Sequence, residues 1–481
     1  MNLSEGMDRM QTYTPSLENL FNRISLRGRC IYFIGIGGIG MSAVARILIN
    51  EGCVVAGSDV RQSSLTSTLE KMGASINTKQ DGSFMSSETD MVVISAAISE
   101  DNPDLKTARK MGIKVVKYSQ ILGSLMKEKR GVAISGTHGK TTTSAMVSTI
   151  LKMAGLDPTF VIGGEVPDIG GNSYLGKGNL FVAEACEYDR SFLNLAPQVG
   201  VITNIEEDHL DYYENIEKII NAFGDFVSLI SKDGLLVVNS NDANTAFAIK
   251  RANCRVETFS LDNSSDWRGE ILFTRNGINK FSVYRKDQYF DDFSLRIPGS
   301  HNILNALAAT AVCTFVGVNK DIIKAALMSY KGADRRFQIV GVKNNITVID
   351  DYAHHPTEIN VTLKAAREFY PDKRIWCIFQ PHQYSRTRHL LNGFAKSFQN
   401  ADKVILADIY AARDSEFEQT AINASKLCEE TRKAGVDVQY IPQLSDIVDF
   451  IYANARRGDI IITMGAGNIW KVAYDLVSKL G

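Results

Sequence analysis

Three features are missing from this sequence, and each absence excludes a class of protein. No run of about 18 apolar residues occurs, so no membrane-spanning helix is expected. The formal net charge is −1, which excludes the clustered basic excess of a protein that grips nucleic-acid backbone. The seven cysteines are scattered without a Cys-x-x-Cys pair, a pattern typical of free thiols in a reducing compartment.

A signal peptide is not expected at the start of the sequence, because residues 1–27 contain acidic side chains and no apolar core of about 7–15 residues. A chain of 481 residues is too long for one hydrophobic core, and about 150 residues per domain predicts three domains. We therefore expect a soluble, cytoplasmic, multidomain α/β protein.

The most informative stretch is Gly-Thr-His-Gly-Lys-Thr-Thr-Thr at residues 136–143. Residues 131–135 before it are apolar and partly β-branched, which predicts a buried parallel strand, and residues 144–151 after it have helical composition. This is the layout of a phosphate-binding loop, in which backbone amides cradle the phosphates. Lys140 would then supply a positive charge, and the Thr141 hydroxyl could ligate Mg²⁺. The sequence predicts a nucleoside triphosphate site.

The spacing of this loop departs from the usual Gly-x-x-x-x-Gly-Lys-Ser/Thr pattern. Its first glycine, Gly136, lies three residues before Gly139, and Ile134 stands where the longer form has glycine. A tight strand-to-helix turn without a ligand is therefore the alternative interpretation.

A second glycine turn, Gly-Ile-Gly-Gly-Ile-Gly, occupies residues 35–40. It follows an apolar strand at residues 30–34, and the next strand, at residues 53–59, ends in Asp59, as in dinucleotide-binding folds. Taken alone, this pattern predicts a nicotinamide-dependent oxidoreductase. Because a separate phosphate loop begins soon after, and a glycine turn serves any pyrophosphate, we favour a UDP-sugar at the first turn and ATP at the second.

Acidic and imidazole side chains follow two further strands of the middle region. The strand at residues 179–187 carries Glu184 near its end, and the strand at residues 199–205 precedes His209. Since ligands bind at the carboxyl ends of parallel strands, we expect Glu184 and His209 to converge on the phosphate loop. With Thr141 they would form a shell for Mg²⁺. A solvated helix start is the alternative for the acids at 206 and 207.

The middle region continues with a change of pattern. Residues 235–295 alternate in polarity, and a hairpin signal at 274–278 indicates a small antiparallel insert. Helical sequence then returns, with His301, Asn302 and Asn305 on one face of the first turn, where an amide could pair with an adenine edge. Capping of the helix by Ser300 or Asn302 is the alternative.

The last third of the chain repeats the strand-then-polar-loop arrangement. A junction lies at residues 332–337, and four apolar strands follow at residues 346–350, 374–379, 403–407 and 459–464. Six of the seven histidines fall at strand–loop or loop–helix junctions, and only His389 does not. Such a concentration indicates a polar, phosphate-binding cleft between domains.

Eight motifs together resemble the Mur ligases over about residues 28–480. The motifs are Gly-Ile-Gly-Gly-Ile-Gly-Met-Ser (35–42), Gly-Ser-Asp (57–59), Gly-Thr-His-Gly-Lys-Thr-Thr-Thr (136–143), Asn-Ile-Glu-Glu-Asp-His-Leu-Asp (204–211), His-Asn-Ile-Leu-Asn-Ala (301–306), Asp-Asp-Tyr-Ala-His-His-Pro-Thr-Glu (350–358), Gln-Pro-His-Gln-Tyr-Ser-Arg-Thr (380–387) and Met-Gly-Ala-Gly-Asn-Ile (464–469). The His-His and Gln-Pro-His motifs most resemble the alanine-adding branch of the family.

The resemblance implies an α/β protein of three domains that follow an N-terminal extension at residues 1–28. These would be a Rossmann-like, UDP-sugar-binding domain with a parallel sheet (29–130), a central P-loop ATPase-like domain (131–334) and a Rossmann-like C-terminal ligase domain (335–481).

The activity that the resemblance implies is ATP- and Mg²⁺-dependent amide ligation in peptidoglycan synthesis. The γ-phosphoryl group would pass to the lactyl carboxylate of UDP-N-acetylmuramate, and the amine of L-alanine would attack the acyl phosphate. A ligase that attaches a preformed peptide to the same sugar is the alternative. We expect no nucleic-acid or membrane partner, and a monomer or weak homodimer.

The resemblance also implies roles for individual residues. The catalytic group comprises Lys140, His209, His354, His382 and Arg386. The ATP-binding group comprises Gly136, Thr137, His138, Gly139, Lys140, Thr141, Thr142, His301, Asn305, Arg336 and Asp351. The UDP-sugar group comprises Gly35, Gly37, Gly38, Gly40, Ser58, Asp59 and Ala97. The amino acid would meet Tyr352, His382 and Arg386, and the metal would meet Thr141, Glu184 and His209.

Three departures from the family pattern bear on these roles. Gln383 stands where Arg is common, which removes a positive charge near the amino-acid site. The run at 186–190 replaces a more acidic one, so the acid that meets metal besides Glu184 stays open. The loop at 411–417 lacks the usual proline-glycine continuation. Lys218 is the nearest candidate for the carbamylated lysine of some relatives.

Overall fold

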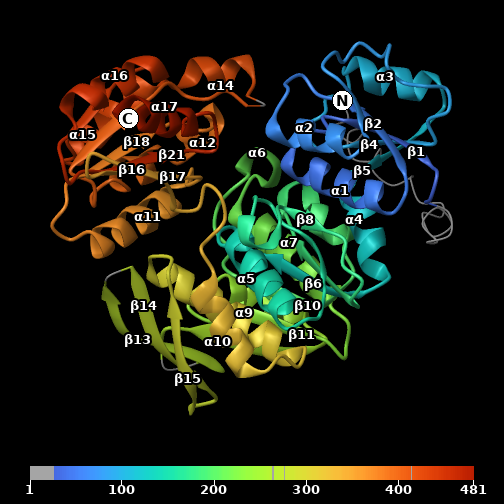
Figure 1. Cartoon of the computed structure of the whole chain (residues 1–481), viewed down its shortest axis with the longest axis horizontal. Coiled ribbons are helices and arrows are strands. Elements are labelled where there is room, and N and C mark those ends of the chain that lie inside the picture. The colour runs from blue at the N-terminus through green and yellow to red at the C-terminus, as the bar shows by residue number, and fades with distance from the viewer. Residues whose placement is uncertain (1–25, 263–264, 276, 413) are drawn as a thin grey trace, which may run out of the picture. The chain divides into compact units, whose positions relative to one another are not determined.

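The computed structural model in Figure 1 describes residues 26–262, 265–275, 277–412 and 414–481. The predicted extension at residues 1–28 thus lies almost entirely outside the described residues. The chain divides into two compact units, Met1–Glu128 and Lys129–Gly481. In the described residues, the first unit contains one sheet and the second contains two.

The first unit is a parallel sheet with strand order β3-β2-β1-β4-β5. Its central strand β1 is almost entirely apolar because both of its faces are buried. Since the strand order reverses between β1 and β4, the glycine turn after β1 lies at the position where open α/β sheets bind ligands. The strands and helices are β1 (Cys30–Ile34), α1 (Ile39–Asn50), β2 (Val54–Ser58), α2 (Ser64–Lys71), β3 (Ser75–Asn77), β4 (Met91–Ile94), α3 (Pro103–Lys110), β5 (Lys114–Lys117) and α4 (Tyr118–Lys127).

The central sheet of the second unit has the order β15-β14-β13-β12-β11-β10-β6-β9-β7-β8. Its middle strand β6 is apolar on both faces and leads directly into the phosphate loop. The elements are β6 (Arg130–Ser135), α5 (Lys140–Met153), β7 (Thr159–Val161), β8 (Ser173–Tyr174), β9 (Leu180–Glu184), β10 (Pro197–Ile202), α6 (Leu210–Tyr213), α7 (Ile216–Ser228), β11 (Leu235–Asn239), α8 (Thr245–Ala248), β12 (Arg255–Ser260), β13 (Trp267–Arg275), β14 (Ile278–Arg285), β15 (Gln288–Leu295), α9 (Ser300–Phe315) and α10 (Lys320–Ser329), with 3-10 turns at Pro167–Ile169, Tyr188–Asn194 and Ile249–Arg251.

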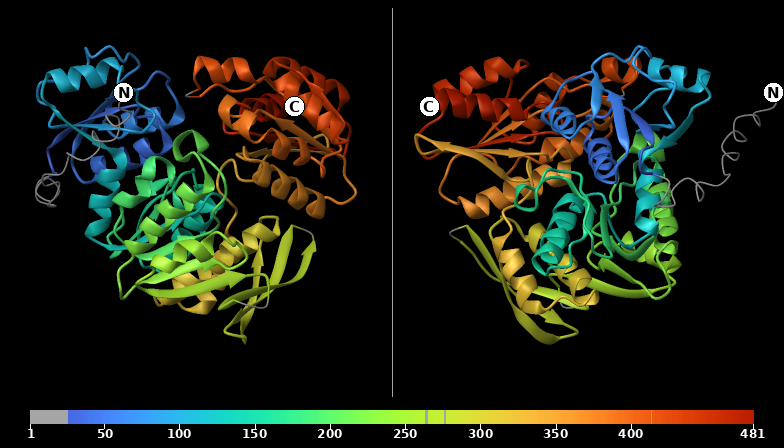
Figure 2. Two further views of the ribbon diagram at one scale, coloured as in Figure 1. Left: turned by 180° about the vertical axis from the view of Figure 1, so that it is seen from behind. Right: turned by 45° about the vertical axis from the view of Figure 1, so that its right-hand side comes forward.

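The prediction of a small antiparallel insert at residues 235–295 is only partly correct. Strands β11 and β12 are parallel members of the central sheet, and antiparallel pairing is confined to β13, β14 and β15. These three strands extend the same sheet, as both views of Figure 2 show, because β13 pairs with β12. Apolar side chains on alternate positions, among them Phe281 and Val283, are buried in the core that the helices share.

Helices α5, α9 and α10 pack against one another and against the central sheet (Figure 1). Their small apolar side chains, such as those of Ala145 and Ala308, are fully buried in one continuous core with the strands. This packing sets the N-terminal half of α9 beside the first turn of α5, where the phosphate loop ends.

The C-terminal sheet has the order β16-β17-β21-β18-β19-β20, and only the β16–β17 pair is antiparallel. Apolar clusters cover both of its faces, which explains the near-continuous apolar strands. The elements are β16 (Gln338–Lys343), β17 (Ile346–Asp351), α11 (Pro356–Phe369), β18 (Ile375–Phe379), α12 (Tyr384–His389), α13 (Leu391–Lys396), β19 (Lys403–Leu406), α14 (Glu416–Ala421), α15 (Ala424–Lys433), β20 (Val438–Tyr440), α16 (Leu444–Asn454), β21 (Ile460–Met464) and α17 (Trp470–Leu480).

The predicted fold class, α/β with a sheet in each of three domains, is confirmed. The seven cysteines, which all lie in the described residues, are free thiols as expected. In the same part of the chain, no helix combines the length and apolar character needed to cross a membrane.

Candidate active site

The phosphate loop joins β6 to α5 in a conformation that requires glycine at two positions. Gly136 has φ 134° and Gly139 has φ 83°, both in the left-handed range. A Cβ at Gly136 would lie 1.9 Å from Thr203 Oγ1, and one at Gly139 would lie 2.6 Å from Asn305 Oδ1. Asn204 anchors the loop through two hydrogen bonds. Its main-chain O accepts from Thr137 N at 3.0 Å, and its Oδ1 accepts from His138 N at 2.8 Å. The loop is thus braced by β10 and α9.

Lys140 is the first residue of α5, and its ammonium group lies inside the loop. Its Nζ donates to the carbonyl oxygens of Gly136 at 2.5 Å and Thr137 at 3.0 Å. It also donates to both carboxylate oxygens of Glu187, at 2.9 and 3.0 Å. Burial alone would lower the pKa of Lys140, but the Glu187 carboxylate outweighs it and the pKa is raised. A permanent cation therefore faces the first turn of α5, whose free amides favour an anion.

The predicted metal residues contact two carboxylates near Lys140, those of Glu184 and Glu187. Thr141 Oγ1 donates to Glu184 Oε2 at 3.0 Å, and Glu184 Oε2 also accepts from Gly163 N at 2.7 Å. His209 Nε2 lies 3.9 Å from Glu187 Oε1, the same carboxylate that binds Lys140. Glu187 was not among the predicted site residues; the acidic run in which it stands was the only signal.

The donor set fits Mg²⁺, which prefers oxygen ligands and keeps several waters beside substrate phosphates. The hydroxyl of Thr141, the carboxylate of Glu184 and the imidazole of His209 would supply three ligands, and water and substrate phosphates would complete the coordination. A separate cluster of metal-ligating side chains in the described residues consists of His138, Glu206 and His355, whose ligand atoms all lie within 4.8 Å of one another.

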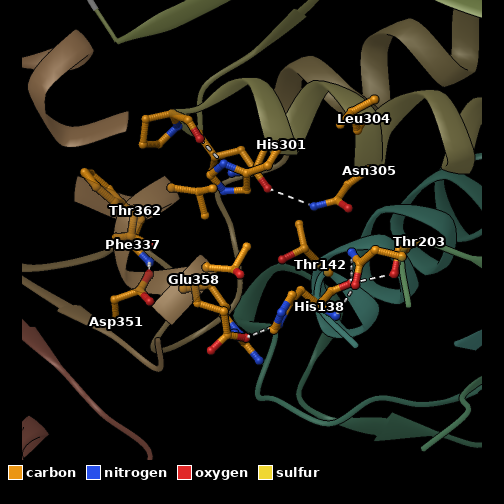
Figure 3. A pocket seen from close by; sticks show the side chains of 18 of the residues that line it. His138, Thr142, Thr203, His301, Leu304, Asn305, Phe337, Asp351, Glu358 and Thr362 are labelled. Atoms are coloured by element: carbon orange, nitrogen blue, oxygen red, sulfur yellow. Dashed lines mark hydrogen bonds and ion pairs between the residues drawn. The ribbon is translucent and has the colours of Figure 1, made fainter. Parts of the chain in front are cut away.

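A cavity of about 970 Å³, including its open mouth, adjoins the loop. Figure 3 shows its walls: His138 and Thr142 from the phosphate loop and α5, His301 and Asn305 from α9, and Asp351 and Glu358 from the C-terminal sheet and α11. The cavity thus brings together predicted ATP residues from both sheets of the second unit.

The α9 residues of this wall are bound to one another. Asn305 Oδ1 accepts from Thr143 Oγ1 at 3.2 Å, and its Nδ2 donates to Asn302 Oδ1 at 3.1 Å. Asn302 Nδ2 in turn donates to Pro298 O at 2.7 Å, so the amide of Asn302 ties down the start of the helix. Burial, reinforced by Arg336, lowers the pKa of His301 to about 4, so that its imidazole is neutral near pH 7.

The opposite wall is formed by the junction and by the end of β17. Asp351 Oδ2 accepts from Phe337 N at 2.7 Å and its Oδ1 from Ala353 N at 2.8 Å. Burial raises the pKa of Asp351 to about 6. Arg336 lies over the ring of Tyr352, 5.2 Å from its centroid, and its Nη2 lies 3.5 Å from Thr141 Oγ1. Arg336 therefore links this wall to the predicted metal residues.

The residues predicted for catalysis from the C-terminal part of the chain meet the central sheet through Asp208. Arg386 Nη2 and Nε donate to Asp208 Oδ1 at 2.9 and 3.1 Å, and Arg386 Nη1 donates to His382 O at 2.6 Å. Burial would raise the pKa of Asp208, but Arg386 holds it well below its usual range. Asp208 was missed, although it directly precedes His209 in a quoted motif.

The two neighbouring histidines of the C-terminal part lie close to Arg386. The rings of His354 and His382 are 6.2 Å apart at their centroids, and His382 stacks on Tyr410. Burial lowers the pKa of His354 to about 4. His354, His382 and Arg386 thus form one cluster. Tyr352 adjoins it, because its ring lies 5.3 Å from that of His354 and also faces the guanidinium groups of Arg335 and Arg336.

Two acidic residues that were not among the predicted site residues lie against the histidines at the junction of the two sheets. Glu358 Oε1 lies 3.1 Å from His138 Nδ1, and Figure 3 shows the two side chains pointing toward each other. Glu206 Oε2 accepts from Thr357 Oγ1 at 2.6 Å. Burial alone would lower the pKa of His138, but Glu358 and Glu206 raise it to about 9. Glu206 is therefore engaged in a contact and is not merely a solvated helix start.

The residues that depart from the family pattern occupy different surroundings. Gln383 is 4% exposed, and its Nε2 donates to Ser385 Oγ at 2.9 Å beside Arg386. Lys218 is half exposed and pairs with Glu214 at 2.6 Å on α7. In the loop at 411–417, Arg413 lies outside the described residues, and Asp414 Oδ1 accepts from Ser385 N at 3.0 Å.

The glycine turn of the first unit is stabilised by an anion. Gly37 N donates to Asp59 Oδ2 at 2.9 Å, and a Cβ at Gly37 would lie 2.8 Å from the same oxygen. Gly35 begins the turn with φ 78°, Gly38 caps α1, and Gly40 packs beside Tyr118. Ala97 N donates to Ser95 Oγ on the neighbouring loop. Ser58 is fully buried, with its Oγ 2.5 Å from Asp104 Oδ2, and so supports the turn from beneath.

Comparisons with known proteins identify this arrangement. Three family models match: "Mur ligase family, catalytic domain" at residues 30–130, "Mur ligase middle domain" at 134–313 and "Mur ligase, glutamate ligase domain" at 335–467. A UDP-N-acetylmuramate–L-alanine ligase of Caldanaerobacter subterraneus is 46% identical, with 93% of this chain and 97% of the relative covered. One of Acetivibrio thermocellus is 47% identical, with 92% and 94% covered.

Solved structures agree with these matches. The UDP-N-acetylmuramate-alanine ligase of Thermotoga maritima has a TM-score of 0.81 at 29% identity, covering 93% of this chain and 98% of that one. A murein peptide ligase of Psychrobacter arcticus has a TM-score of 0.72 at 27% identity, covering 94% and 99%. This chain belongs to the Mur ligase family.

Proposed function

We propose that this chain is an ATP-dependent ligase that adds L-alanine to the lactyl carboxylate of UDP-N-acetylmuramate in peptidoglycan synthesis. The observation that carries the proposal is the 46% identity to an enzyme of that name over 93% of the chain, together with an intact phosphate loop around Lys140. The nicotinamide-dependent oxidoreductase hypothesis is replaced by the family assignment.

The first step that we propose is transfer of the γ-phosphoryl group of ATP to the lactyl carboxylate. Two anions must approach each other, so positive charge and positioning supply most of the catalysis. Lys140 would leave Glu187 for the β- and γ-phosphates, and the first-turn amides of α5 would bind the same oxygens. Asn305 would hold the loop in shape, His301 would line the base pocket, and Asp351 would meet the ribose.

We propose Mg²⁺ as the metal, held by Thr141, Glu184 and His209. When bound, Mg²⁺ neutralises phosphate charge and orients the γ-phosphoryl group. Glu187 lies between Lys140 and His209, so that it can bind either the lysine or the metal shell as phosphates enter.

The second step is attack of the L-alanine amine on the acyl phosphate, with loss of phosphate. We propose that Arg386, His382 and His354 face the acyl phosphate and the amino acid. Burial lowers the pKa of His354 to about 4, so its imidazole is neutral near pH 7 and could orient the amine by accepting a hydrogen bond from it. The packing of α11 and α12 against the central loops would keep water away from the acyl phosphate.

We extend the proposal to the domain boundaries, the sugar-nucleotide site, the location of the protein and its oligomeric state. We propose domain boundaries at residues 130/131 and 334/335, UDP-sugar binding by the glycine turn at residues 35–40 with Asp59, a cytoplasmic location, and a monomer or weak homodimer.

The test is phosphate release from ATP and Mg²⁺ in the presence of UDP-N-acetylmuramate, comparing L-alanine, glycine, L-serine and a free tripeptide. We expect release that requires both the sugar nucleotide and L-alanine. Release only with the tripeptide would assign the chain to the activity named for the Psychrobacter structure, a peptide ligase. Absence of release with every nucleophile would contradict the proposed ligase activity.

A further inference from the structure

A second cluster of metal-ligating side chains lies beside the proposed nucleotide site. The cluster consists of three residues, His138, Glu206 and His355, whose ligand atoms all lie within 4.8 Å of one another. The facing atoms are His138 Nε2, Glu206 Oε2 and His355 Nδ1. His138 comes from the phosphate loop and Glu206 from the loop after β10, whereas His355 caps α11 in the C-terminal part. The cluster therefore spans the contact between the two sheets of the second unit.

Each imidazole turns one ring nitrogen toward the Glu206 carboxylate. His138 Nδ1 lies 3.1 Å from Glu358 Oε1, and its Nε2 lies 3.4 Å from Glu206 Oε2. Because these carboxylates raise the pKa of His138 to about 9, a metal ion would displace the proton on Nε2. Among the described residues, this buried Nε2 makes no hydrogen bond. His355 Nε2 donates to Glu207 O at 3.1 Å, and its unprotonated Nδ1 accepts from Thr357 N at 3.3 Å and lies 3.9 Å from Glu206 Oε2.

The outer contacts are those that orient metal ligands. A ligating histidine usually donates its other N–H to a carboxylate or a main-chain carbonyl. His138 does the first with Glu358, and His355 does the second with Glu207. The Glu206 carboxylate is fixed by Thr357 Oγ1 at 2.6 Å. Each of the two imidazoles thus has a partner on the nitrogen away from the cluster, and Thr357 binds the same Glu206 oxygen that faces the histidines.

The distances suit a tetrahedral ion after a small contraction. Zn²⁺ binds nitrogen and oxygen at about 2.0–2.2 Å, which separates two tetrahedral ligands by roughly 3.3 Å. The pair His138 Nε2–Glu206 Oε2 is already at 3.4 Å, and Glu206 Oε2–His355 Nδ1 is at 3.9 Å. Two imidazoles and one carboxylate favour a transition metal over Mg²⁺. Glu206 lines cavities on both sides of the cluster, so a fourth position is accessible.

We propose that His138, Glu206 and His355 form a binding site for one divalent transition metal, Zn²⁺ by preference, separate from the proposed magnesium site. The ion would tie the phosphate loop to the first turn of α11. Bound zinc would therefore hold the two sheets in the arrangement of this structure, and it would slow any cycle that needs them to separate. The inference concerns metal binding and does not depend on the ligase activity.

The test is equilibrium dialysis of the full-length, reduced chain against zinc chloride at micromolar concentration, with metal content measured by atomic emission. Because the seven free thiols can also bind zinc, the result is read as the difference between wild type and variants. We expect Glu206→Gln and His355→Asn each to bind one equivalent less than wild type. Asparagine preserves the capping role of His355 on α11.

Two further variants sharpen the result. Thr357→Val removes the hydroxyl on Glu206 while keeping the side-chain shape, and we expect zinc affinity to fall about 10-fold. Glu184→Gln, at the proposed magnesium site, should keep the full zinc equivalent. Melting curves without metal would verify that each variant is folded. Equal zinc content in wild type, Glu206→Gln and His355→Asn, or no zinc bound by wild type, would overturn the proposal.

Discussion

The two glycine turns of this chain, at residues 35–40 and 136–139, share a strand–turn–helix layout but differ in the charge that faces the turn. In the first unit, the Asp59 carboxylate accepts from Gly37 N at 2.9 Å. In the second, the Lys140 ammonium donates to two loop carbonyls at 2.5 and 3.0 Å. In the first turn a carboxylate accepts a hydrogen bond from a main-chain amide, whereas in the second an ammonium group donates to main-chain oxygens.

This difference teaches that a glycine turn alone does not specify a ligand. The cation in the second loop neutralises phosphates directly, as transfer of a phosphoryl group requires. The anion at the first turn cannot do so; its hydrogen bond from Gly37 N fixes the shape of the turn. The second turn is therefore suited to chemistry on phosphates, and the first to holding a substrate.

The largest expected effect that separates the two turns is loss of Lys140. Lys140→Ala should lower turnover by roughly 10²–10³-fold or more, because it removes charge stabilisation in the transition state, while UDP-N-acetylmuramate affinity stays unchanged. Phosphate release and calorimetric titration of the sugar nucleotide measure the two effects. Lys152→Ala, at the far end of the same helix, is the matched control. Retained turnover in Lys140→Ala would falsify the assignment of the loop.

The two units should also differ in their response to acid. All seven histidines lie in the second unit, and the pKa of His301 falls from 6.5 to about 4 on burial. The unfolded chain takes up this proton below about pH 6.5 but the folded chain does not until about pH 4. Stability is therefore present above pH 6.5 and lost as pH falls toward 4, by on the order of 3 kcal/mol.

Tryptophan fluorescence follows this loss specifically, because Trp267, Trp376 and Trp470 all lie in the second unit. We expect His301→Gln to flatten the dependence of the tryptophan-reported melting midpoint on pH between 6.5 and 4. An unchanged slope in that variant would show that other groups account for the acid loss.

Two positions, Gly139 in the second turn and Gly38 in the first, should differ in their tolerance to a methyl group, although Gly35 and Gly37 of the first turn are also constrained. Gly139→Ala places alanine at φ 83° and 2.6 Å from Asn305 Oδ1, which should cost about 2–3 kcal/mol. Gly38→Ala in the first turn has φ −63° and no atom nearer than 3.4 Å, and should cost roughly 0.5 kcal/mol or less. Urea denaturation of both variants measures the contrast. Similar losses in the free energy of unfolding would mean that these two positions are equally constrained.

The smallest effect is expected at the anion of the first turn. Asp59→Ala removes the acceptor of Gly37 N, so we expect the KM for UDP-N-acetylmuramate to rise about 10-fold with the KM for ATP unchanged. Asp101→Ala, an exposed acid of the same unit, is the control. If the KM for ATP rises to the same extent, the assignment of the sugar nucleotide to the first turn and of ATP to the second is contradicted.

Local signals predicted the phosphate loop and the α/β class well. The apolar strand at 131–135 and the glycines at 136 and 139 form the predicted strand–loop–helix unit because each depends on neighbours in sequence. The insert at 235–295 was less predictable. Strands β11 and β12 have the composition of short strands, and only pairing within the sheet makes them parallel members of it.

The sequence by itself therefore determined the strands, the glycine turns and the order of the polar motifs, because these follow from local backbone preference and apolar patterning. Only the tertiary structure decided which polar groups meet. His138 and Glu358 are separated by 220 positions, and Arg386 and Asp208 by 178. Such pairs form where the loops of two sheets pack together and bury charge, so each group takes the partner that the packing presents. No local pattern encodes that partner.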